Sequence, residues 1–306
     1  MSLVDKIYEQ IEKSESQDFV SSDFVFEDYL IDKEYLKDNK PTKTLIELSY
    51  DKFEELIIKY KNMIEIEYRI NIDEFFKIIR KNKDSTFTDN ETRLRKEFSD
   101  FSKKFHQAYK IISKNFASAY IKKKGLTICP YCDRAFINIY KKENSNYVRP
   151  DLDHFYHKSK YPFLACVLDN LIPSCISCNE RLKHTMDCYE KECEIPLKDD
   201  EYIFENIEFY YDNNGIIVEN CSNKKVKNFA KYMSIKEQYS IHIDIKEHLK
   251  NKLRAYNKIK QKNIKKLCRI SEVELENMVF SEYINIEKHK TILWKLKTDL
   301  YNKMKN

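Results

Sequence analysis

Apolar residues recur at helical spacing over most of this 306-residue chain. The pattern predicts a short helix at Leu3–Lys13, helical structure from Thr44 to about Lys81, and a long helix over residues 91–124 that ends at Gly125. Large side chains follow one face of the long helix, which predicts a core-facing stripe: Leu94, Phe98, Phe101, Phe105, Tyr109, Ile112, Phe116 and Tyr120. The pattern is broken by a polar segment at 82–89, predicted to be a loop, and returns over 225–306.

Two stretches carry strand patterns instead. Residues 148–155 read as one strand, and residues 201–220 read as two short strands around an Asp-Asn-Asn-Gly turn. With only 2 Gly and 6 Pro in the chain, we expect an α+β fold that is predominantly helical. The expected regions are a helical part at 1–124, a central module at 125–200, and a hairpin with basic helices at 201–306.

Composition narrows the class of protein. Charged residues make up 34% and hydrophobic residues 42% of the chain. The first residues contain no apolar signal-peptide core and no run of 18 apolar residues occurs, so we expect a cytoplasmic protein without a membrane span.

The net charge of +5 is unevenly distributed, because residues 81–125 and 201–306 are basic whereas residues 1–80 are acidic. The segment Lys246–Arg269 holds ten Lys or Arg and one Glu. It predicts a basic helix that either faces nucleic acid or stays in water, and both readings remain open.

Nine cysteines in a chain with no secretion signal indicate thiols and metal ligands. Four of them form two CxxC pairs, Cys129-Pro-Tyr-Cys132 and Cys175-Ile-Ser-Cys178, which predict a structural zinc site with four protein ligands. A thioredoxin-type redox role would need only one such pair. We expect the other five cysteines to be buried or incidental thiols: Cys166, Cys188, Cys193, Cys221 and Cys268.

Between the cysteine pairs lies a candidate hydrolytic centre. Asp153 and His154 end the expected strand, Asn170 precedes a short apolar segment, and Asn179 directly follows Cys178. Asn179 and Lys183 are four residues apart on an expected helix, so they share one face. A lone Asp-His pair is more often structural than catalytic, and it is the combination of residues that favours catalysis.

The motifs CPYC, DLDHF, KSKYP, DNL and CISCN together resemble the HNH, or ββα-metal, endonuclease family in its subgroup with a four-cysteine zinc frame. The resemblance covers about residues 126–185. It implies that His154 is the general base, that Asp153 and Asn179 bind a catalytic divalent ion, and that Asn170 orients the base. Many relatives carry Pro where this chain has His157, so the roles of His157 and of the nearby His184 stay open.

The chemistry of such a centre is phosphodiester hydrolysis. An ordinary imidazole titrates near pH ~6.5, so a neutral His154 can take a proton from water. The oxygen ligands implied by the resemblance suit Mg²⁺ or Mn²⁺. Three nearby lysines, Lys158, Lys160 and Lys183, are candidates to hold flanking phosphates.

The motifs are also similar to HNH nucleases of bacterial anti-phage defence, of the Septu and retron-associated type. This similarity implies DNA as substrate and an ATPase as partner, with the helical region at 1–124 as a candidate docking or regulatory part. Two alternatives remain: an RNase of the same fold, and a non-catalytic zinc module that binds nucleic acid or protein.

Overall fold

A computed structural model describes residues 1–15, 17, 19–82, 85–141, 147–198, 201–212, 215–219, 221–284, 286–288 and 290–305. The chain divides into two compact units. The first unit combines Met1–Lys123, Leu152–Ile172 and Thr185–Tyr189, and the second combines Lys124–Asp151, Pro173–His184 and Glu190–Asn306. The expected central module at 125–200 is therefore shared between the two units.

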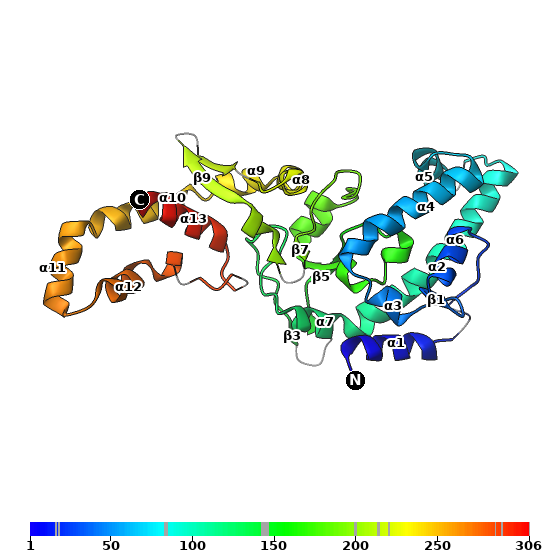
Figure 1. The fold of residues 1–306 in the computed structure, drawn as a ribbon, viewed down its shortest axis with the longest axis horizontal. Coiled ribbons are helices and arrows are strands. Elements are labelled where there is room, and N and C mark those ends of the chain that lie inside the picture. The colour runs from blue at the N-terminus through cyan, green and yellow to red at the C-terminus, as the bar shows by residue number, and fades with distance from the viewer. Residues whose placement is uncertain are drawn as a thin grey trace. The chain divides into compact units, whose positions relative to one another are not determined.

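The first unit begins with the predicted helix, α1 (Leu3–Lys13), which Ser2 and Asp5 cap reciprocally. It is followed by α2 (Phe26–Asp32), the short antiparallel pair β1 (Leu36–Lys37) and β2 (Lys40–Pro41), and α3 (Lys43–Ile46). These elements appear in blue in Figure 1.

The segment from Thr44 to Lys81, expected to be helical, consists of three helices. After α3 come α4 (Phe53–Tyr68) and α5 (Ile72–Arg80). Arg69 adopts a left-handed conformation that ends α4, and the Asn71 side chain accepts a hydrogen bond from the Glu74 N–H to begin α5. The spacing of apolar residues does not reveal these two local signals for a helix end and a helix start.

The long helix is present as α6 (Asp89–Ile111), a π-helical turn (Ile112–Phe116) and α7 (Ala117–Lys124). Thr88 and Glu91 form a capping box at its start, and Gly125, with φ of 66°, follows its end as predicted. Most of the predicted stripe is core, because these members are buried: Leu94, Phe98, Phe101, Phe105, Ile112 and Tyr120.

The strand expected at 148–155 is two strands, β4 (Tyr147–Val148) and β5 (Asp151–His154). Arg149 and Pro150 separate them, and a proline has no N–H to donate to a strand partner. β4 pairs with β3 (Tyr140–Lys141), whereas β5 pairs with β6 (Leu171–Ser174). The expected helix around Asn179 is a π-helical turn over Ser177–Lys183.

The second unit contains the predicted hairpin. β9 (Glu208–Asp212) pairs antiparallel with β10 (Gly215–Glu219), with Gly215 opposite Asp212. The two central turn residues, Asn213 and Asn214, lie outside the described residues. A shorter pair, β7 (Leu197–Lys198) and β8 (Glu201–Tyr202), precedes the hairpin.

Helices complete the second unit: α8 (Lys224–Tyr232), α9 (Ile235–Ser240), α10 (Ile243–Ala255), α11 (Lys258–Cys268), α12 (Glu272–Ile284) and α13 (Trp294–Lys305). The basic helix expected at 246–269 is thus two helices, α10 and α11, shown in orange in Figure 1. Asn257 accepts a hydrogen bond from the Lys260 N–H at 3.1 Å and starts a new helix there.

The fold class expected from the sequence is confirmed at this level: an α+β protein, mostly helical, with small two-stranded sheets. None of the helices in the described part of the chain combines the length and apolar character needed to cross a bilayer.

Candidate functional site

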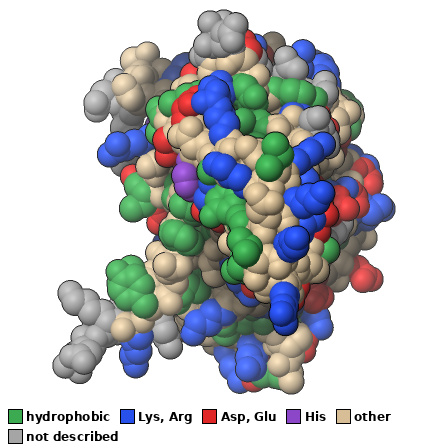
Figure 2. Space-filling model, turned by 90° about the vertical axis from the view of Figure 1, so that its left-hand side faces the viewer, with side chains coloured by type: hydrophobic (Ala, Val, Ile, Leu, Met, Phe, Trp, Pro, Cys, Tyr) green, Lys and Arg blue, Asp and Glu red, His purple; other side chains and the backbone are tan. Residues whose placement is uncertain are grey.

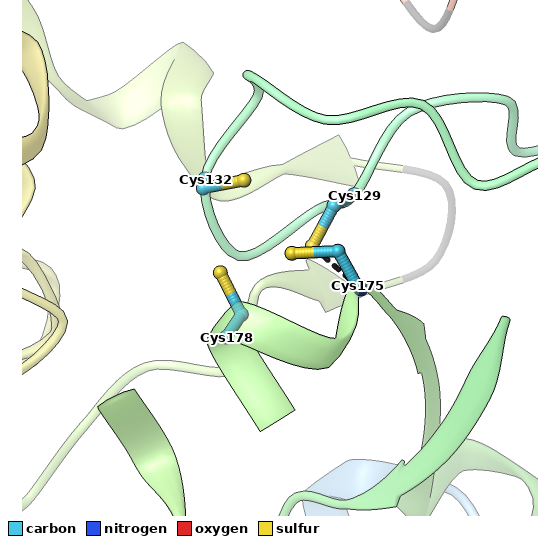
Figure 3. Close-up of side chains that lie close together, drawn as sticks. All are labelled: Cys129, Cys132, Cys175 and Cys178. Carbon is cyan, nitrogen blue, oxygen red and sulfur yellow. Dashed lines mark hydrogen bonds between the residues drawn. The ribbon is translucent and has the colours of Figure 1, made fainter. Parts of the chain in front are cut away.

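The four predicted zinc ligands converge in the second unit. The Sγ atoms of Cys129, Cys132, Cys175 and Cys178 all lie within 4.8 Å of one another, and Figure 3 shows them pointing toward one another. Thiolates around a tetrahedral zinc ion lie about 2.3 Å from it. The observed cluster could therefore hold a metal ion such as zinc.

Two backbone turns bring the thiols together. In the first, the Asp133 N–H donates to the Cys129 carbonyl at 2.9 Å, and Asp133 takes a left-handed conformation with φ of 52°. In the second, the Asn179 N–H donates to the Cys175 carbonyl at 3.0 Å. The Cys175 N–H also donates to the Cys129 Sγ at 3.4 Å, which links the two turns directly (Figure 3).

The four thiols of the cluster shift one another's pKa values in different directions. Burial raises the pKa of the Cys129 thiol, and hydrogen bonding with Cys129 raises that of Cys178. Hydrogen bonding with Cys129 lowers the pKa of both Cys132 and Cys175. Four thiols therefore do not ionise alike by themselves, whereas a metal ion stabilises the thiolate form of each ligand.

The remaining cysteines match their expected role in part. Cys166, Cys188 and Cys193 are buried, Cys221 is half-buried and Cys268 is exposed. The four-cysteine cluster is the one group of three or more cysteine, histidine or acidic side chains with metal-binding spacing among the described residues.

His154 lies in the first unit at the end of β5 and is 7% exposed. Its Nε2 lies 3.0 Å from the carbonyl oxygen of Ala165. A carbonyl accepts hydrogen bonds and does not donate them, so Nε2 carries the proton in this contact. In the neutral ring the lone pair is then on Nδ1, which is the nitrogen able to take up a proton.

Asn170 organises the loop between β5 and β6. The side chain is fully buried; its Oδ1 accepts from the Tyr156 N–H at 2.8 Å, and its Nδ2 donates to the Tyr156 and Leu164 carbonyls, both at 3.0 Å. Its own carbonyl accepts from the Phe155 N–H at 2.9 Å. Asn170 thereby joins the residues that follow His154 to the segment that precedes Ala165.

Helix α6 contributes one ring beside His154 and one beside the Lys158 backbone, and the sequence analysis assigned neither residue to the site. The rings of Tyr109 and His154 are 4.3 Å apart, edge to face. One turn earlier, the ring of His106 donates a hydrogen bond to the backbone of Lys158, and burial lowers the pKa of His106. The sequence analysis assigned Tyr109 to the core stripe. Both residues could have been recognised as site candidates because each places a polar ring on an otherwise apolar helix face.

The three candidate phosphate lysines differ in their surroundings. The Lys158 ammonium lies 4.8 Å from the centre of the Tyr109 ring; burial lowers its pKa while the charge of Asp153 acts to raise it. Lys160 is buried and pairs with Asp187 at 2.6 Å, and Lys183 is 1% exposed. Lys160 and Lys183 are thus buried, whereas Lys158 is half-buried.

Asp153, also in the first unit, is 5% exposed. Asn179 belongs to the second unit, where its Nδ2 donates to the Asp151 carboxylate at 3.2 Å. Asp151 is a further acidic residue that the sequence analysis did not assign. Its spacing of two residues from Asp153 on β5 is the signal that could have marked it.

The two other histidines near the motif take local roles. His157 Nδ1 contacts the Ser159 hydroxyl at 2.8 Å within a turn. His184 is exposed and ends the helical turn that begins at Ser177, where its N–H donates to the Asn179 carbonyl at 2.8 Å. The described contacts assign neither histidine a ligand role.

No protein-family model, curated protein or solved structure matches this chain. The class of protein that its fold and geometry define is an α+β protein with a four-cysteine cluster that could hold a metal ion.

Proposed function

We propose that this protein is a metal-dependent endonuclease of HNH type that hydrolyses phosphodiester bonds in DNA. The observation that carries the proposal is the contact of His154 Nε2 with the Ala165 carbonyl, since it leaves the lone pair of the neutral ring on Nδ1. A general base needs a nitrogen in this state and a fixed ring. The Asn170 hydrogen bonds and the Tyr109 ring supply the fixation.

In the proposed reaction, Nδ1 of His154 removes a proton from a water molecule, and the resulting hydroxide attacks the phosphorus in line with the leaving 3′ oxygen. Lys158 lies beside this centre and can hold a non-bridging phosphate oxygen. A divalent ion, when bound, would stabilise the negative charge that develops on the phosphate and on the leaving oxygen.

The donor types fit such an ion. Asp153, which directly precedes His154, offers a carboxylate, and hard oxygen ligands are those that Mg²⁺ and Mn²⁺ take. We infer that the four-cysteine cluster holds a separate, structural zinc ion, because a site with four protein ligands has no open position for a substrate.

DNA as substrate is supported by charge. Helix α11 contains five lysines and no acidic residue, and Lys258, Lys260 and Lys262 are all exposed. Figure 2 looks at the face where the C-terminal helices lie, and Lys and Arg side chains are spread across it. A surface of this kind attracts the phosphate backbone of either DNA or RNA, so an RNase of the same fold is the second candidate.

The test is nicking of a supercoiled plasmid with Mg²⁺ or Mn²⁺. His154→Ala is expected to lower the rate by at least about a hundredfold, the usual contribution of a general base. His248→Ala, which changes a histidine on α10, is the matched control and should cleave as wild type does. Equal cleavage by the His154→Ala protein would reject the assignment, and cleavage of RNA but not of plasmid would select the RNase.

Motif similarity further suggests a role in anti-phage defence with an ATPase partner. The chain purified with its genomic neighbours should retain that partner. A chain that cleaves constitutively and without a partner would contradict this part of the proposal.

A further inference from the structure

The second unit contains a hollow of about 560 Å³ beside the four-cysteine cluster. Its walls come from the first cysteine turn and the strand that follows it, from β4 and the start of β5, and from the second cysteine turn. A hollow of this volume is within the range that binds small organic groups. None of the reactions proposed for His154 uses it.

The rim of the hollow is unusually apolar for a solvent-exposed surface. Phe136 and Tyr140 are each 57% exposed, Ile176 is 60% exposed and Val148 is 40% exposed, and all four line the same hollow. Exposed aromatic rings gathered at one hollow mark a binding surface more often than chance. Flat rings on a polar, charged protein are platforms on which nucleobases stack.

A cation lies in the same wall. Arg134 donates from Nε to His242 Nε2 at 3.0 Å and from Nη1 to the Gln238 Oε1 at 3.0 Å. Burial and the nearby guanidinium lower the pKa of His242, so this partner is neutral near pH 7. Two neutral acceptors orient the guanidinium without cancelling its charge, and an oriented guanidinium is suited to a phosphate.

We propose that this hollow binds the unpaired bases of a single-stranded nucleic acid. The bases stack on Phe136 and Tyr140, and the adjoining phosphate contacts Arg134. A zinc ion with four thiolate ligands carries a net negative charge, so the end nearest the cysteines accepts a neutral base better than a phosphate. The site is distinct from His154, and its existence does not depend on cleavage.

The experiment compares two labelled strands of equal length, one with bases and one made of abasic nucleotides, by fluorescence anisotropy. The protein carries His154→Ala and the buffer contains no divalent ion, so no strand is cut. We expect the hollow to bind the strand with bases at least about tenfold more tightly than the abasic strand, because one stacked base contributes roughly that factor.

Phe136→Ala combined with Tyr140→Ala should remove this preference while leaving the affinity for the abasic strand within about twofold. Phe136→Trp combined with Tyr140→Trp should retain it. Tyr211→Ala, which removes an exposed tyrosine from β9 of the same unit, is the matched control and should also retain it. Because both strands carry the same phosphates, a general loss of charge or folding lowers both affinities together and is recognised as such.

Arg134→Gln should weaken binding of both strands and reduce the dependence of affinity on salt, whereas Arg134→Lys should preserve that dependence. If the Phe136 and Tyr140 variant still prefers the strand with bases, the proposal is wrong. That result would leave the hollow as a surface for an apolar side chain of a protein partner. Failure of the nuclease proposal is recognised separately, by plasmid cleavage that persists in the His154→Ala protein.

Discussion

The cysteine cluster and the His154 loop come from one stretch of chain and are ordered in different ways. In the second unit the four thiols of the cluster come together, and the Cys175 N–H donates a hydrogen bond to one of them, the Cys129 Sγ. The loop in the first unit is held by a buried Asn170 that makes three side-chain hydrogen bonds. We therefore expect a bound metal ion to contribute more to the order of the cluster than to the order of the loop.

This difference has a practical consequence for the function. A metal ion that is removed takes its binding free energy with it, and in small zinc modules this energy is a large part of the folding energy. A buried side-chain amide cannot be removed by a chelator. The proposed structural ion and the proposed catalytic base are therefore separable by experiment, although they lie within the same motif of the sequence.

The largest effect is expected from Cys175→Ser. The variant should lose its zinc and, with it, on the order of 10 kcal/mol of folding free energy in the cysteine cluster. Metal analysis checks the zinc content, and hydrogen exchange followed by mass spectrometry should show fast exchange in 124–151 and slower exchange in 152–172. Cys268→Ser, at an exposed cysteine, is the control. Retention of zinc and of native exchange would show that the cluster is not a metal site.

Asn170→Ala is expected to give the reverse pattern. It leaves the Tyr156 N–H, the Tyr156 carbonyl and the Leu164 carbonyl without their partner, which costs about 3–5 kcal/mol in total. Urea unfolding measures the loss, and zinc content should be unchanged. Asn263→Ala removes an amide from an exposed position on α11 and should leave stability as it is. A loss of zinc together with stability would mean that the two regions are not independent.

Tyr109 tests how closely the ring of His154 is held. An edge-to-face pair contributes about 0.5–1.5 kcal/mol, so Tyr109→Leu is expected to slow plasmid cleavage by about threefold to tenfold. Tyr109→Phe keeps the ring and should remain within about twofold of wild type. A slow Phe variant would instead assign the effect to the hydroxyl group, which lies 3.5 Å from the Leu152 carbonyl.

The smallest effect concerns pH. Burial lowers the pKa of His106, so the unfolded chain binds a proton on this residue more readily than the folded protein does. Above about pH 6.5, the ordinary pKa of histidine in an unfolded chain, His106 is neutral in both states and costs no stability. As the pH falls below this value, the unfolded chain takes up the proton first, so the free energy of unfolding decreases. Urea midpoints between pH 7 and pH 5 should fall less for His106→Asn than for wild type.

His184→Asn, at an exposed position, is the control for this measurement and should follow wild type. Parallel pH curves for wild type and the His106 variant would show that protonation of His106 is not linked to unfolding.

Helix positions were predictable where the signal is local and repeated. The bounds of α1 match the prediction, and Gly125 ends α7 in the expected left-handed conformation. Predictions were wrong where one residue interrupts a sustained pattern: Pro150 between β4 and β5, and Asn257 between α10 and α11. In each case a cap or a missing N–H outweighs the periodicity of the side chains.

The sequence by itself determined the four-cysteine cluster, because the CxxC spacing confines two thiols of each pair to one turn and zinc chemistry joins the pairs. It also marked His154, Asp153, Asn170 and Asn179 as candidates, and their catalytic roles remain predictions. Only the tertiary structure decided which nitrogen of His154 bears the proton, that α6 brings Tyr109 to its ring, and that Phe136 and Tyr140 gather at one hollow. These depend on contacts between residues far apart in the chain, and no local pattern encodes such distances.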